Sequence, residues 1–98
     1  YNNVSIPLSD ILYVEALGNY VKIVRVSGGH VLTRANLKTI TDMLPDGAFL
    51  RIHRSYVISI SSVVSFTRTR VELKGLAEGL PVGAQYAGQV ADMLGSGF

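Results

Sequence analysis

The hydrophobic residues in the first quarter of the chain fall into short runs of the composition typical of β-strands. Ile11–Val14 and Tyr20–Val26 are rich in β-branched and aromatic side chains. Between them stands Gly18-Asn19, a two-residue connector of the kind that adopts positive φ in tight hairpin turns. The pattern therefore predicts a β-hairpin, followed after a glycine turn by a third extended segment at Val31–Thr33.

The spacing of hydrophobic residues changes to a helical period at two places. Asn36 is a favourable N-cap residue, and the apolar residues after it share one stripe of a short helix that Pro45 ends. A second helix is predicted from Ala84, with Gly95 as its stop. Its expected apolar stripe consists of Tyr86, Ala87, Val90, Met93 and Leu94.

The rest of the chain is predicted to be extended. Phe49–Ile60 has the character of one largely extended stretch, and Val63–Phe66 and Arg70–Leu73 form a strand pair. Leu80–Val82 is a short strand, in which Pro81 suits an edge position because proline cannot donate to a neighbouring strand. The predicted fold class is mainly β, with a short central helix and a C-terminal helix.

Length and composition exclude several classes of protein. A chain of 98 residues fits one domain, and 48% hydrophobic residues argue against disorder. Without cysteine there is no disulfide framework and no thiolate metal site, which suits a reducing, cytoplasmic location. No apolar run approaches the roughly 20 residues that span a bilayer. The chain begins Tyr1-Asn2-Asn3, so we interpret residues 1–98 as one domain, with a core at about 4–94, from a longer regulator.

Charge is unevenly distributed along the chain. All nine Lys and Arg residues fall between Lys22 and Lys74 with only three acidic residues, so this stretch carries a net charge of +6, whereas the flanks carry −4. A basic middle between acidic ends favours one surface that faces a polyanion. Charge alone leaves open the alternative that these side chains are merely scattered over a solvated surface.

Residues 49–56, FLRIHRSY, form the segment most suggestive of chemistry. Arg51, His53, Arg54 and Ser55 lie within five residues and between two aromatic side chains. An arginine fork fits guanine O6 and N7 or a phosphate, and hydroxyl groups commonly contact phosphate. From composition alone, the same segment could be an ordinary charged end of a strand.

The string FLRIHRSYVIS resembles the signature of the LytTR domain, which reads R-x-H-[RKN]-S before an aromatic and aliphatic pair. SDILYVEALGNYVKI is similar to the family's opening hairpin, and TRANLKTITDMLP to its central helix. VVSFTRTRVELKGLAEGLPVGAQY resembles its closing hairpin and the turn before the last helix. The resemblance covers about residues 4 to 94. It implies a compact β-sheet assembly whose loops enter successive major grooves on one face of DNA.

Three places are expected from the resemblance to approach DNA bases. They are the hairpin tip around Gly18, the signature segment, and the turn at residues 83–86. With Arg34 as a phosphate contact, the expected DNA-binding residues are Asn19, Tyr20, Lys22, Arg34, Arg51, His53, Arg54, Ser55, Gln85 and Tyr86. Further phosphate contacts are expected from Arg25, Arg68 and Arg70.

The chain departs from the family pattern at two of its motifs. Gly83, Ala84 and Gln85 stand where relatives commonly have a serine and arginines, so glutamine, which can read adenine, replaces an arginine contact. Ile58-Ser59 replaces the more usual Val-Asn. These departures bear on base readout more than on the fold.

The two histidines do not indicate an enzyme. His53 is expected to hold the loop that presents Arg54, and His30 to be a solvent-facing turn residue. No nucleophile with an orienting partner accompanies them, and two histidines without nearby carboxylates make a poor metal site. The chain is therefore expected to have no catalytic residue, no bound metal, no cofactor and no small-molecule substrate.

The resemblance implies the output domain of a bacterial transcription regulator of the two-component type. Such regulators typically bind paired direct repeats in promoter DNA as dimers, and an upstream receiver or sensor domain often drives dimerisation. An alternative from another class is a β-rich protein-interaction module, whose basic strip would bind an acidic partner or the upstream sensor domain. Electrostatic attraction would drive both DNA binding and binding to an acidic partner, so salt dependence does not distinguish the two hypotheses. Competition of an unrelated duplex against a specific duplex does distinguish them.

Overall fold

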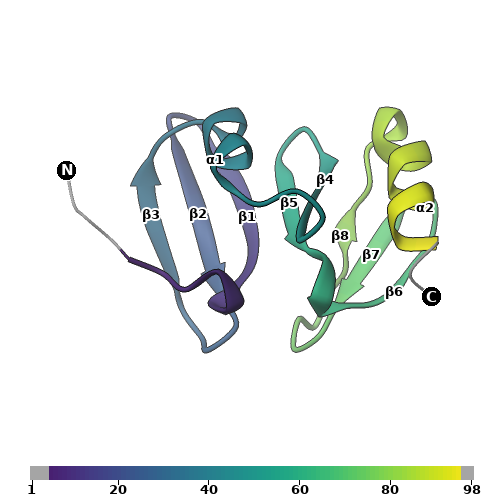
Figure 1. Cartoon of the computed structure of the whole chain (residues 1–98), viewed down its shortest axis with the longest axis horizontal. Coiled ribbons are helices and arrows are strands. Elements are labelled where there is room, and N and C mark those ends of the chain that lie inside the picture. Colours follow the sequence, from purple (N-terminus) through teal and green to yellow (C-terminus); the bar gives the residue numbers. More distant parts are fainter. Residues whose placement is uncertain (1–4, 96–98) are drawn as a thin grey trace.

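The computed structural model describes residues 5–95, which form two antiparallel sheets and two α-helices (Figure 1). The larger sheet has the order β3-β2-β1-β5-β4, with β1 (Ile11–Leu17), β2 (Tyr20–Arg25), β3 (His30–Arg34), β4 (Phe49–His53) and β5 (Tyr56–Ser59). The smaller sheet has the order β6-β7-β8, with β6 (Val63–Phe66), β7 (Arg70–Leu73) and β8 (Leu80–Pro81). The helices are α1 (Leu37–Met43) and α2 (Ala87–Gly95), and short 3-10 turns are η1 (Leu8–Asp10), η2 (Ile60–Ser62) and η3 (Ala84–Tyr86). This architecture confirms the predicted fold class.

The larger sheet packs against other elements on both of its faces, because the side chains of a strand alternate between them. Helix α1 covers one face, where its buried Leu37 packs with Ile11, Val14, Val21 and Val57. The other face forms a second core with the smaller sheet and α2; its fully buried members include Ile52, Ile58, Val71, Val90 and Leu94. Two cores thus fix the orientation of the larger sheet, from which the candidate site projects.

Local signals placed most elements correctly. Gly18 has φ of 61° in the β1–β2 turn, as expected for a tight hairpin connector. Asn36 caps α1, because its side-chain oxygen accepts a hydrogen bond of 2.8 Å from the backbone N–H of Thr39. Pro81 lies on the edge strand β8, as its missing N–H requires.

Two expectations need correction. Residues 49–60 are not one extended stretch: the chain turns at Arg54-Ser55, so β4 and β5 pair as a hairpin, with His53 opposite Tyr56. The hydrophobic spacing alone did not predict this turn, whereas the family resemblance implied a loop that presents Arg54. On α2, Val90 and Leu94 are buried, but Met93 is 39% exposed and stands at the edge of the apolar stripe.

Candidate nucleic-acid interface

Three connections meet at one end of the molecule, the upper end in Figure 1. They are the β1–β2 turn at Gly18-Asn19, the β4–β5 tip at Arg54-Ser55, and η3 before helix α2. Because β5 runs antiparallel to β1, the turn that precedes β5 lies at the same end as the turn that follows β1. The β4–β5 tip stands between the other two connections in the view of Figure 1.

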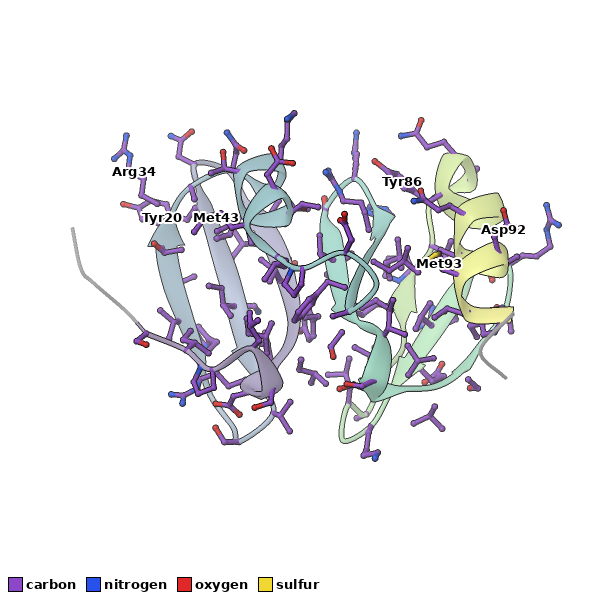
Figure 2. All side chains as sticks on the ribbon, in the orientation of Figure 1. Tyr20, Arg34, Met43, Tyr86, Asp92 and Met93 are labelled. Carbon is purple, nitrogen blue, oxygen red and sulfur yellow. The ribbon has the colours of Figure 1, made fainter. Side chains whose placement is uncertain are left out.

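The β1–β2 turn and the end of β3 form the first part of this surface. Tyr20 pairs with Arg34 across the sheet, and 45% of Tyr20 is exposed. Gly18, Asn19 and Arg34, with the two residues that precede α1, line a shallow hollow of about 290 Å³. Figure 2 shows Arg34 projecting from this end of β3. A hollow with exposed amide and guanidinium groups at its rim can accept a phosphate or a base edge.

Lys22, which was expected at the same hairpin, lies two residues inside β2 and has an intrachain partner. Its Nζ is 3.4 Å from Glu15 Oε1, and its side chain is 28% exposed. The other carboxylate oxygen of Glu15 accepts a hydrogen bond of 3.2 Å from the Tyr56 hydroxyl. Burial raises the pKa of Tyr56, and the nearby Glu15 carboxylate raises it further. Tyr56 therefore stays a neutral donor, and Glu15 joins the first hairpin to the second.

The β4–β5 tip is held by side chains from the end of β4, directly before the tip. Arg51 donates from Nε to the carbonyl of His53 at 3.0 Å and from Nη2 to the carbonyl of Arg54 at 2.6 Å. His53 Nδ1 accepts a hydrogen bond of 3.0 Å from the Ser55 backbone N–H, which is the supporting role expected for His53. The Arg54 side chain is exposed and, among residues 5–95, has no hydrogen-bond or ion-pair partner. The tip thus presents one free guanidinium on a braced backbone.

The third connection packs directly against the second. His53, Arg54, Gly83, Ala84, Gln85 and Tyr86 line an open hollow of about 390 Å³. The Gly83 N–H donates to the Ile52 carbonyl at 2.8 Å, which ties this turn to β4. A Cβ on Gly83 would lie 3.1 Å from Cδ2 of Tyr86, so glycine permits the close approach. The side chain of Gln85 is exposed at the rim.

The basic side chains divide into two groups by their contacts. Lys22, Arg25, Lys38, Arg51 and Arg70 contact acidic side chains or backbone carbonyls. Within the described part of the chain, no such partner exists for Arg34, Arg54, Arg68 and Lys74. Arg25, which was expected near phosphate, bonds to Asp10 at 2.7 Å at the opposite end of the sheet. Of the unpaired group, Arg34 and Arg54 lie at the end where the three connections meet.

Comparison with known proteins identifies the fold and the family. A sequence profile of the LytTr DNA-binding domain matches residues 1–95. This chain belongs to the LytTR family. The LytTr DNA-binding domain of a Bacillus cereus protein, described as a methyl-accepting/DNA response regulator, superposes with a TM-score of 0.81 at 22% identity. The superposition covers 94% of this chain and 87% of that one, so the two share a fold.

One curated relative is a protein considerably longer than this chain. An uncharacterized response regulatory protein of Vibrio cholerae is 32% identical over 66 residues, which is 64% of this chain and 25% of the relative. This LytTR chain therefore matches about a quarter of the relative's length. Within residues 5–95, no helix combines the length and apolar character needed to cross a membrane.

The contact that sequence reasoning missed in this LytTR domain is the one made by Glu15. Glu15 lies directly opposite Lys22 on β2 and opposite Tyr56 on β5. Counting outward from a two-residue turn at Gly18-Asn19 pairs Glu15 with Lys22, so the register implied the ion pair. No local pattern implied the pairing with Tyr56, because β5 lies about 40 residues further along the chain.

Proposed function

We propose that this LytTR domain binds double-stranded DNA sequence-specifically, as the output domain of a bacterial regulator of the two-component type. The observation that carries the proposal is the placement of Arg54. It is an exposed guanidinium without an intrachain partner, on a braced tip between two further connections that carry exposed polar side chains. Arginine in this setting can donate both hydrogen bonds that guanine accepts in the major groove.

The order of the connections suits contact along one face of a duplex. In Figure 1 the β4–β5 tip stands between the β1–β2 turn and η3. The family resemblance implies loops that enter successive major grooves on one face of DNA, so the two outer connections would approach the duplex on either side of the β4–β5 tip.

Each side chain at this end is assigned a role by its chemistry. Arg54 reads guanine, and the amides of Asn19 and Gln85 suit adenine. Arg34 and the Ser55 hydroxyl bind phosphate and so set the position of the domain on the duplex. Two tyrosines, Tyr20 and Tyr86, flank the contacts, and Lys22 contributes a weakened charge because Glu15 offsets it.

The wider assembly follows from the same proposal. An upstream receiver or sensor domain would bring two copies together on paired direct repeats, and binding would take place in the cytoplasm, where the DNA is. Binding uses no cofactor or small-molecule substrate, and the role is recognition rather than catalysis.

One observation favours the protein-interaction alternative. Leu17, Tyr20 and Leu32 lie on the same face of the larger sheet and are 42%, 45% and 54% exposed. Exposed apolar side chains that share a face can bind a protein partner. In this alternative the basic strip would bind an acidic partner beside the apolar face, so the module would bind acidic polymers and unrelated duplexes alike.

The test is selection of duplexes from a random pool with the purified domain, followed by competition. DNA readout predicts that a recurrent sequence is enriched and that a scrambled duplex of the same composition competes at least about 1,000-fold less well. Equal competition by the scrambled duplex or by polyglutamate would instead support the protein-interaction alternative.

A further inference from the structure

We propose that Arg51 is a positioning residue, which sets the geometry of the β4–β5 tip and couples it to the turn at residues 83–86. This inference rests on the proposed function, because it assigns to Arg51 a structural task within the DNA-binding end. Its place in the signature suggests a DNA contact, but its hydrogen bonds face the protein. Arg51 would then affect DNA recognition through Arg54 and Gln85 and would not itself touch DNA.

The hydrogen bonds of Arg51 are the first argument. Nε and Nη2 donate to two successive backbone carbonyls, those of His53 and Arg54. A planar guanidinium presents these donors in a fixed fork, so it fixes the relative orientation of the two carbonyls. The side chain is half-buried, which leaves less of it available to a ligand.

The conformation of the tip is the second argument. Tight two-residue hairpin turns ordinarily use positive φ, yet no residue other than glycine between positions 5 and 95 has positive φ. The pairing of β4 with β5 also shifts register between Arg51 and His53. A tip without the standard turn conformation depends on side chains to define it, and Arg51 and His53 supply those hydrogen bonds.

The contact with Tyr86 is the third argument. The guanidinium carbon of Arg51 lies 5.9 Å from the centre of the Tyr86 ring, within the range of a cation–π interaction. The neighbouring Gly83 N–H is bonded to the Ile52 carbonyl. One side chain therefore contacts both the backbone that carries Arg54 and the turn that carries Gln85, and its loss would loosen both.

The test compares Arg51→Lys and Arg51→Ala with Arg25→Lys, an arginine that also donates within the protein but lies at the opposite end of the sheet, where it bonds to Asp10. Lysine keeps the charge but cannot reproduce the fork. We expect both Arg51 variants to lose roughly tenfold in affinity for the selected duplex, at an unchanged slope of log affinity against log salt. Arg25→Lys should keep nearly wild-type affinity, because the Arg25–Asp10 contact lies away from the end that is proposed to bind DNA.

Hydrogen exchange in the free domain tests the brace without DNA. The Ser55 N–H bonds to His53 Nδ1, and the Ser55 carbonyl accepts from the Ala16 N–H at 2.9 Å. Both amides should exchange about tenfold faster in Arg51→Lys, while amides of the buried strand β7 keep their protection. A wild-type domain that does not discriminate between duplexes contradicts the proposed function but leaves this measurement valid.

The coupling is measured with a double-mutant cycle. Arg51→Ala and Tyr86→Leu should each relax preference at the base pairs read by Gln85, and the double variant should lose less than the product of the two single losses. Three results would overturn the proposal. The first is wild-type DNA affinity together with wild-type amide exchange rates in Arg51→Lys. The second is a salt slope that falls by about one unit in Arg51→Ala and returns to the wild-type slope in Arg51→Lys. The third is fully additive effects of Arg51→Ala and Tyr86→Leu in the double-mutant cycle.

Discussion

Replacing Arg54 by alanine should remove base readout and leave the fold intact. The side chain is exposed and makes no contact with another described residue through a hydrogen bond or ion pair, so unfolding free energy should change by less than about 0.5 kcal/mol. The backbone carbonyl that accepts from Arg51 survives the substitution. A bidentate arginine–guanine contact contributes about 1–3 kcal/mol, so affinity for the selected duplex should fall roughly 5- to 150-fold.

The assay for Arg54→Ala is fluorescence anisotropy at fixed salt with the selected duplex and with a scrambled duplex. Affinity for the scrambled duplex should change by less than about threefold, because one of several charges is lost. Arg54→Lys is the matched control: it keeps the charge and should retain binding to scrambled DNA without restoring the preference. Equal losses of Arg54→Ala on both duplexes, restored by lysine, would show that Arg54 contacts phosphate and would refute base readout.

Three further substitutions test the structure around the site. The Arg25 hydrogen bond lowers the pKa of Asp10, so its stabilising effect is present above the unfolded pKa of 3.8 and is lost as pH falls through the lower folded value. Thermal melts of Asp10→Asn should therefore fall below wild type at neutral pH and converge with it in strong acid; a constant difference would contradict this. For Tyr56 the folded pKa is raised, so its contribution is present below pH 10.0 and is lost as pH rises through the higher folded value. The difference in phenolate absorbance between wild type and Tyr56→Phe reports the titration of Tyr56, and its midpoint should lie above pH 10.0. A midpoint at or below pH 10.0 would argue against the buried hydroxyl. Gly83→Ala should destabilise the fold by about 1 kcal/mol in urea, because its Cβ meets the Tyr86 ring at 3.1 Å; wild-type stability would show that the ring moves freely.

Elements whose stability comes from their own residues could be predicted from the sequence. Gly18-Asn19 specifies its own turn, and Asn36 caps its own helix, so local chemistry was sufficient for both. Hydrophobic spacing did not predict the Arg54-Ser55 tip, which is held by the side chains of Arg51 and His53 at the end of β4. These hydrogen bonds span only two or three positions, but they join particular side chains to particular backbone groups, and general turn propensities do not describe such pairs.

The same distinction applies to the site. The family resemblance pointed to the three segments that the fold brings to one end, because each segment matches a motif of the family. It could not tell an arginine that faces solvent from one that faces the protein. Arg51 and Arg54 stand three positions apart in one motif, yet the first donates to backbone carbonyls and the second has no described partner.

An NMR titration of the isotope-labelled domain with the selected duplex locates the surface that binds DNA. We expect the amide shift changes to concentrate at residues 18–20, 54–55 and 84–86. Residues at the opposite end, such as Asp10 and Ser27, should stay unchanged. A scrambled duplex should give smaller shifts over the same surface, because phosphate contacts remain when base contacts are lost. Shifts centred on the opposite end, or equal shifts with both duplexes, would contradict the claim that this end of the molecule reads DNA sequence.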